Sequence, residues 1–284
     1  MIVVTGATGQ LGRLVIKHLI NKVDASNIIA AVRTPAKASD LADLGVQVRE
    51  ADYSKPETLN SAFKGAEKVL LISSSEIGQR AEQHKNVIDA AKEQGVSLVA
   101  YTSLLNADTS PLALAEEHIE TEKQLSQSGV PYVLLRNGWY TENYLASVPA
   151  SVEHGAFIGS AEAGKISSAA REDYAEAAAA VLTAQAPQAG KVYELAGDES
   201  YTLTELAALV SQVAGKEVPY VNLPENEFEQ ALIGAGLPEP LVALLANSDV
   251  GASKGGLFDD KKQLSTLIGH PTKSLIAMLK ETVQ

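Results

Sequence analysis

The chain opens with Ile2-Val3-Val4-Thr5-Gly6-Ala7-Thr8-Gly9-Gln10-Leu11-Gly12, and this stretch decides the fold. Its three glycines stand three residues apart, between a β-branched run and a helical pattern. Glycine permits a sharp turn, and the amides and dipole of the following helix favour an anion. A glycine-rich turn without a ligand is the alternative interpretation. The strand before it, the helix after it and a second strand favour the dinucleotide-binding βαβ unit.

The end of the second expected strand indicates which dinucleotide binds. Sites selective for NAD usually carry Asp or Glu there, to bind the ribose hydroxyls. This sequence instead reads Ala30-Ala31-Val32-Arg33-Thr34. A guanidinium can form charge-assisted hydrogen bonds with a 2′-phosphate, which a carboxylate would repel. We therefore expect the cofactor to be NADPH/NADP+, although a solvated surface role for Arg33 is the alternative.

Short apolar runs alternate with helical patterns through the first half of the chain. Runs of this kind, bounded by turn residues, are typical of parallel strands buried on both faces. The pattern predicts an α/β protein with a Rossmann-type, doubly wound parallel sheet. The expected strands are Ile2–Val4, Ile28–Val32, Val46–Arg49, Val69–Ile72, Leu98–Thr102 and Val133–Leu135. The expected helices are Leu11–Ile20, Lys37–Leu44, Pro56–Phe63, Ala81–Gln94 and Ala113–Ser128.

The second half is less regular. A helix from Asp173 to Thr183 and a strand over Lys191–Leu195 are predicted, and Thr202-Leu203-Thr204-Glu205 has the spacing of a capping box. Several prolines and a Gly-Gly pair interrupt the helical pieces after Leu223. We predict an NADP-binding Rossmann domain over residues 1–150. Residues 151–284 are predicted to complete the cofactor site and to form a smaller, loop-rich substrate lobe.

Composition narrows the classes of partner. The formal net charge is −12 and no cluster of basic residues stands out, so we expect no nucleic-acid partner. The sequence has no cysteine, which excludes disulfides and thiolate metal sites. No apolar stretch approaches the roughly 20 residues that cross a bilayer. With no signal segment at Met1, we expect a cytoplasmic protein with no membrane partner.

Four later motifs make the family resemblance specific. They are Leu71–Glu76 (LISSSE), Tyr101–Leu104 (YTSL), Leu135–Tyr144 (LRNGWYTENY) and Asp249–Phe258 (DVGASKGGLF). Together with the glycine motif and Arg33, they resemble the atypical short-chain dehydrogenase/reductases of the NmrA-like group. Within that group the sequence is most similar to bacterial NADPH:quinone oxidoreductases, at nearly constant spacing from Met1 to the C-terminal region.

The resemblance implies a role for each matching residue. Arg33 would bind the 2′-phosphate, Asp52 would face the adenine, and Arg171 would complete the cofactor site. The pyrophosphate would lie against Gly6, Ala7, Thr8, Gly9, Gln10 and Leu11. The middle of the cofactor would lie against Ser73, Ser74 and Ser75, and its nicotinamide end against Asn137, Gly138, Trp139, Tyr140, Thr141 and Glu142.

One element of the wider superfamily is missing. Its typical Tyr-x-x-x-Lys pair transfers a proton, but Lys123 here has Ile119 four residues before it. An unactivated ketone benefits from such a donor, whereas a quinone spreads the incoming charge over a conjugated ring. We therefore expect direct hydride transfer from NADPH to a quinone, without flavin or metal. Asn137 would act as the amide donor, and Trp139 and Tyr140 would form aromatic walls. Core packing is the alternative for these two rings.

Other functions stay open on the sequence alone. The missing pair also fits an NADP(H)-binding redox sensor of the NmrA type, and a triarylmethane dye or another conjugated electrophile could replace the quinone. His118 and Glu122 stand four residues apart, and we expect a pair on a helix surface rather than a metal site. A Ser103–His118–Asp108 hydrolase triad lacks the nucleophile-elbow glycines. The oligomeric state is not predicted.

Overall fold

A computed structural model describes residues 1–283, and these contain a seven-stranded sheet in the order β3-β2-β1-β4-β5-β6-β8. Neighbouring strands from β3 to β6 run parallel, with Val4 opposite Ala30 on one side and Leu70 on the other. This order confirms the predicted Rossmann-type sheet. The strands are β1 (Ile2–Thr5), β2 (Ile28–Val32), β3 (Gln47–Glu50), β4 (Lys68–Leu71), β5 (Leu98–Leu104), β6 (Tyr132–Asn137) and β8 (Val192–Leu195).

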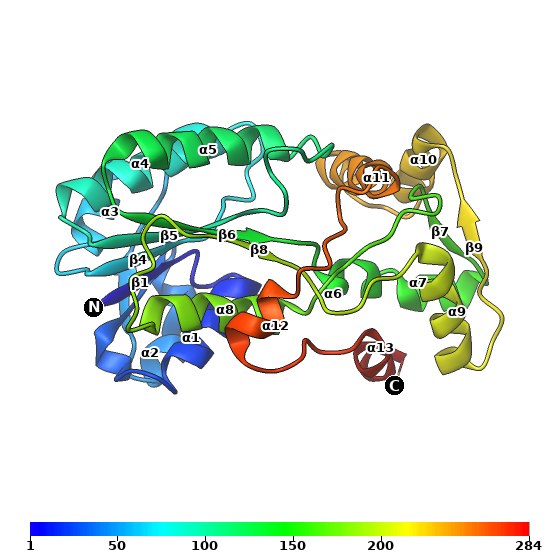
Figure 1. Cartoon of the computed structure of the whole chain (residues 1–284), viewed down its shortest axis with the longest axis horizontal. Helices are drawn as coiled ribbons and strands as arrows, with labels where there is room; N and C mark the ends of the chain where they lie inside the picture. Colours follow the sequence, from blue (N-terminus) through cyan, green and yellow to red (C-terminus); the bar gives the residue numbers. More distant parts are fainter. Residues whose placement is uncertain (284) are drawn as a thin grey trace. The chain divides into compact units, whose positions relative to one another are not determined.

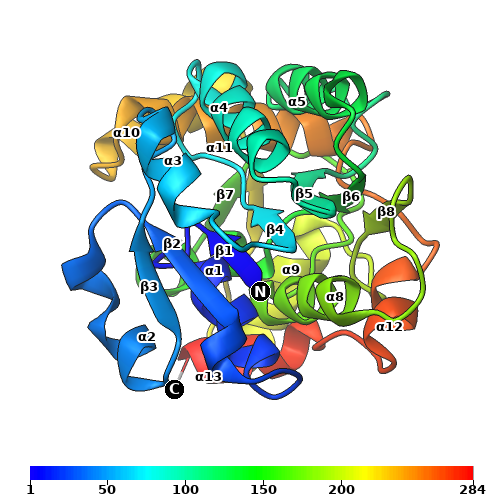
Figure 2. The ribbon, with the colours of Figure 1, turned by 90° about the vertical axis from the view of Figure 1, so that its left-hand side faces the viewer.

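Helices cover both faces of this sheet, so its central strands are buried on both sides. Every residue of β1, β2 and β5 is buried. One face carries α3 (Pro56–Ala62), α4 (Arg80–Glu93) and α5 (Ala115–Ser128); the other carries α1 (Gln10–Leu19), α2 (Ser39–Asp43) and α8 (Arg171–Thr183) (Figures 1 and 2). The helix predicted over Lys37–Leu44 is split. A 3₁₀ turn (Pro35–Ala38) precedes α2, and the Ala38 backbone between them leaves helical geometry (φ −120°, ψ 21°).

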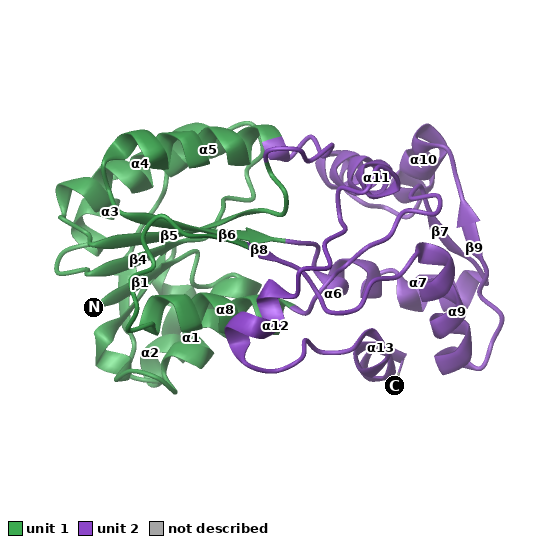
Figure 3. Ribbon diagram, in the orientation of Figure 1, with its two compact units in different colours: residues 1–107, 116–137, 171–193 green, residues 108–115, 138–170, 194–284 purple. Residues whose placement is uncertain are grey.

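The chain forms two compact units, shown in green and purple in Figure 3. Unit 1 contains residues 1–107, 116–137 and 171–193, and unit 2 contains residues 108–115, 138–170 and 194–284. In unit 2, β7 (Phe157–Gly159) and β9 (Tyr220–Asn222) form a small parallel sheet that the sequence did not predict. Its helices are α6 (Thr141–Leu145), α7 (Val148–His154), α9 (Leu203–Ala214), α10 (Glu225–Gly234), α11 (Glu239–Ser253), α12 (Gln263–Ile268) and α13 (Leu275–Val283).

The predicted capping box begins α9. The Thr202 side chain accepts a hydrogen bond from the Glu205 backbone nitrogen, and the Glu205 carboxylate accepts one from the Thr202 nitrogen. Across residues 1–283, none of the helices is both long enough and apolar enough to cross a membrane.

Candidate functional site

The glycine turn lies between β1 and α1 and has the shape of an anion cradle. Gly6 adopts φ +57°, which other residues rarely tolerate. A Cβ at Gly12 would lie 2.5 Å from the Gly6 carbonyl oxygen and 2.7 Å from the Ala7 Cα, so only glycine lets α1 approach so closely. The N-cap of α1 is Gly9, which has no side chain to bind the first amides. The turn therefore fits a pyrophosphate held by backbone amides.

Five predicted site residues and Ser103 lie at or just after the carboxyl ends of β1 to β6. They are Gly6, Arg33, Asp52, Ser73, Ser103 and Asn137. Because these strands are parallel, their carboxyl ends share one edge of the sheet. Unit 1 thus places three kinds of expected residue along a single edge: those for the pyrophosphate, the one for the 2′-phosphate, and Asn137 for the nicotinamide end.

Arg33 follows β2 with an exposed side chain, two-thirds accessible to solvent. Its Nη1 atom lies 2.7 Å from Oε1 of Glu76, in the segment after β4. The sequence analysis did not find this pairing, because 43 residues separate the two and no local pattern links them. An accessible guanidinium in this place fits a 2′-phosphate.

Backbone hydrogen bonds orient the segment after β4. The nitrogens of Ser73 and Ser74 donate to Thr102 Oγ1 and to His84 Nε2, both at 2.9 Å. After β3, the Asp52 carboxylate accepts from the Ser54 nitrogen at 2.9 Å and closes a turn. Hydrogen bonds to β5 and α4 therefore fix the segment that carries the serines.

Asn137 ends β6 and carries the clearest sign of a missing partner. Its backbone oxygen accepts from the Leu105 nitrogen at 3.0 Å, which fixes the residue at the sheet edge. The side chain is 6% exposed, and its Oδ1 atom is buried without a hydrogen-bond partner in the described part of the chain. A buried amide oxygen left unpaired costs about 1–3 kcal/mol, so a hydrogen-bond donor on a bound molecule would fit this atom.

Buried Ser103 and Arg136 form a polar group with the half-buried Glu122 beside this edge. The Ser103 hydroxyl donates to Glu122 at 2.5 Å, and Arg136 holds both oxygens of that carboxylate at 2.9 and 2.6 Å. The prediction that His118 and Glu122 form a surface pair is wrong. His118 is buried, with its Nδ1 atom 2.7 Å from the Tyr101 hydroxyl, and the Glu122 side chain is only 11% exposed. Helical spacing places two side chains on one face but does not reveal what packs against it.

The remaining predicted residues divide between the units. Arg171 begins α8 in unit 1, whereas Gly138 to Glu142 belong to unit 2. In unit 2, Gly138 donates to the Leu195 oxygen at 2.8 Å, and Tyr140 forms a β-bridge with Ala169. The Thr141 hydroxyl lies 2.7 Å from that of Ser168, and Glu142 lies in the first turn of α6. Gly138, Tyr140 and Thr141 are thus held by contacts within unit 2.

A buried carboxyl in unit 2 escaped the sequence analysis. Asp249 accepts from the Tyr144 hydroxyl at 3.0 Å and from the Ser160 nitrogen at 2.9 Å. Burial raises the pKa of Asp249 to about 6. The Trp139 and Tyr144 rings lie 6.3 Å apart, and Trp139 is buried. Tyr144 and Asp249 lie in two of the motifs that carry the family resemblance, but they are 105 residues apart and no local pattern links them.

Metal ligands do not gather anywhere in the described part of the chain: residues 1–283 contain no group of three or more His, Asp or Glu side chains that could hold an ion.

A family model, a protein relative and solved structures all match nearly the whole chain. A model of the NmrA-like family matches residues 1–276. Quinone oxidoreductase 2 of Escherichia coli (strain K12) is 63% identical over 275 residues, covering 97% of this chain and 96% of that protein. A crystal structure of the E. coli NADPH-dependent quinone oxidoreductase with NADPH matches with TM-score 0.97 and 61% identity, covering 100% of both chains. Citrobacter sp. triphenylmethane reductase with NADP(H) matches with TM-score 0.93 and 42% identity, over 100% of this chain and 99% of that one.

Proposed function

This chain belongs to the NmrA-like family, and we propose that it oxidises NADPH and reduces a quinone by direct two-electron hydride transfer. The observation that carries the proposal is the similarity to E. coli quinone oxidoreductase 2 over nearly the full length of both proteins. The substrate would be a small molecule. A cytoplasmic location stays a prediction.

The chain's own residues account for cofactor binding. When bound, NADPH supplies the hydride. The turn from Gly6 to Leu11 would hold the pyrophosphate by backbone amides, and Arg33 would hold the 2′-phosphate. Asn137 would bind and orient a polar group at the nicotinamide end through its buried amide. We assign Asp52, the three serines, Gly138 to Glu142 and Arg171 to the same site on the resemblance alone.

The polar groups around Ser103 favour an acceptor that needs no strong acid. The Ser103 hydroxyl already donates to Glu122, whose other oxygen is held by Arg136. Lys123 points to solvent and lies 3.8 Å from Glu120. Neither can play the part of a tyrosine–lysine pair. A quinone delocalises the negative charge that the hydride brings and then needs one proton, which water can supply. Hydrogen-bond donors such as Asn137 and Tyr140 would therefore suffice.

A direct assay tests the proposal. The purified chain, with no flavin added, should oxidise NADPH in the presence of a simple benzoquinone, as measured by the loss of NADPH absorbance. Faster turnover of a triphenylmethane dye than of any quinone would assign the second candidate acceptor, which the Citrobacter relative supports. Binding of NADPH without turnover of either would contradict the enzyme and favour the NADP(H)-binding sensor.

A further inference from the structure

We propose that Glu76 determines how strongly the chain prefers NADPH over NADH, because its carboxylate competes with the 2′-phosphate for Arg33. This inference rests on the proposed binding of NADPH. It adds a residue that the glycine turn and Arg33 do not reveal: an acidic group, from a different strand end, on the cation that selects the cofactor.

The contact itself is direct. Arg33 Nη1 lies 2.7 Å from Glu76 Oε1, and their side chains are 66% and 39% exposed. Both are accessible to a ligand, so a phosphate reaching the guanidinium meets the carboxylate there. It must either displace Glu76 or bind beside it, and both outcomes lower the affinity for a dianionic group.

A second partner holds the other carboxylate oxygen of Glu76. Its Oε2 atom accepts a hydrogen bond from Gln83 Nε2 at 2.8 Å, and its backbone nitrogen donates to Ser74 Oγ at 3.1 Å. Gln83 belongs to α4 and is only 4% exposed. A surface carboxylate usually gains little from an ion pair because two flexible side chains must be ordered. Here the buried amide of Gln83 already orders the Glu76 side chain.

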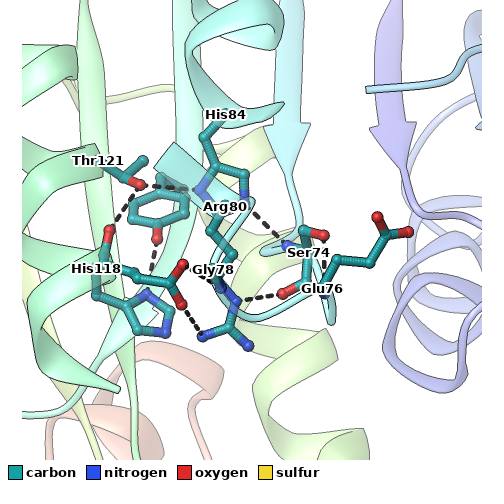
Figure 4. Close-up of polar contacts among 9 residues, drawn as sticks. Ser74, Glu76, Gly78, Arg80, His84, His118 and Thr121 are labelled. Carbon is teal, nitrogen blue, oxygen red and sulfur yellow. Dashed lines mark hydrogen bonds and ion pairs between the residues drawn. The ribbon is translucent and has the colours of Figure 1, made fainter. Parts of the chain in front are cut away.

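The segment that carries Glu76 is itself anchored by two buried side chains of α4 and by Glu117 of α5 (Figure 4). His84 accepts from the Ser74 nitrogen at 2.9 Å, and Arg80 Nε donates to the Ser74 oxygen at 2.5 Å. On the far side of Glu76, the Gly78 nitrogen donates to the Glu117 carboxylate at 2.8 Å. Anchors on both sides keep the carboxylate beside Arg33, so the pair is a built feature of the site.

The consequence is that the charge of Glu76 weakens the preference for NADPH over NADH. An exposed ion pair is worth up to about 1 kcal/mol, which corresponds to about a fivefold change in affinity. Removing the charge of Glu76 should therefore tighten NADPH binding by about threefold to fivefold. NADH has no 2′-phosphate, so its affinity should not change.

The experiment compares the dissociation constants of NADPH and NADH for the full chain and for Glu76→Gln, at low and high salt. Glutamine keeps an acceptor for Gln83 while removing the charge. Glu82→Gln is the matched control, because Glu82 is an exposed acid in the first turn of α4 and its loss changes the net charge equally. We expect tighter NADPH binding only for Glu76→Gln, with a gain that shrinks as salt screens the charges.

Arg33→Ala separates this inference from the proposed function. Loss of NADPH preference in Arg33→Ala, with unchanged affinities in Glu76→Gln, would overturn the role of Glu76 and leave the cofactor assignment standing. Weaker NADPH binding in Glu76→Gln would also overturn it, since it would make Glu76 a support for Arg33 rather than a competitor. If the wild-type chain binds no NADPH, both proposals fail. In the Arg33→Ala background, Glu76→Gln should tighten NADPH binding less than in the wild-type chain, because no guanidinium is left to compete for.

Discussion

His84 Nε2 accepts a hydrogen bond from the backbone nitrogen of Ser74 at 2.9 Å. The ring proton must therefore be on Nδ1, which lies 2.9 Å from Thr121 Oγ1. The Thr121 hydroxyl in turn donates to the backbone oxygen of Glu117. Burial, with a smaller contribution from the charge of Arg80, lowers the pKa of His84 to about 3. The segment that carries Ser73 to Glu76 thus depends on a neutral histidine.

The first prediction follows from that pKa. An unfolded histidine titrates near 6.5, so between about pH 6.5 and pH 3 the unfolded chain binds a proton that the folded chain does not. The stability contributed by neutral His84 is complete above about 6.5 and is lost as the pH falls toward 3. In His84→Gln, the free energy of unfolding should decline less steeply with acid, by up to about 1.4 kcal/mol per pH unit. Urea unfolding at several pH values measures this; parallel slopes would refute it.

Asp249 should show the opposite pH dependence. Its pKa rises from 3.8 to about 6 on folding, so the folded chain holds the proton more tightly. Its contribution to stability is complete below about 3.8 and is lost as the pH rises through about 6. Near pH 7, Asp249→Asn should stabilise the chain by on the order of 2 kcal/mol, because asparagine cannot ionise.

The stabilisation by Asp249→Asn should fade below about pH 4, where the natural side chain is protonated too. Thermal melting at both pH values checks this. The amide can still accept from the Ser160 nitrogen and can donate to the Tyr144 oxygen. Lower stability of the variant near pH 7 would show that the carboxylate is paired more favourably than burial implies.

A third prediction concerns the glycine turn. The added methyl of Gly12→Ala would meet the Gly6 oxygen and the Ala7 backbone at 2.5–2.7 Å, and backbone atoms cannot move aside cheaply. We expect a loss of about 2 kcal/mol or more in stability, with weaker NADPH binding. Gly234→Ala is the control, since it lies in α10 with no atom of the described chain within 4 Å of the added carbon. It should be neutral or stabilising by about 0.5 kcal/mol.

The fourth prediction concerns Asn137. Asn137→Ala removes the buried amide whose Oδ1 atom is unpaired in the described chain. Turnover with a quinone should fall about tenfold or more, a larger change than the one in the dissociation constant of NADPH. Steady-state kinetics and a binding titration separate the two effects. A variant with normal turnover would remove Asn137 from the catalytic site.

The fold was predictable because its signals are local. Buried β-branched runs such as Ile28–Val32 mark strands covered on both faces, and alternation with helices requires a parallel sheet. The Thr202–Glu205 capping box was readable for the same reason. The irregular second half gave weaker signals, so the sheet of β7 and β9, whose strands are three residues each, was missed.

For the candidate site, the sequence alone determined the glycine turn, the strand that Arg33 follows and the edge on which Asn137 lies. Each of these depends on neighbouring residues and on the rule that parallel strands share an edge. Only the tertiary structure showed the ion pair of Glu76 with Arg33 and the hydrogen bond from Tyr144 to Asp249. It also showed that Glu122 binds both Ser103 and Arg136. The physical reason is that periodicity specifies which face a side chain occupies, while its charge, pKa and partner depend on whatever distant segment packs against that face.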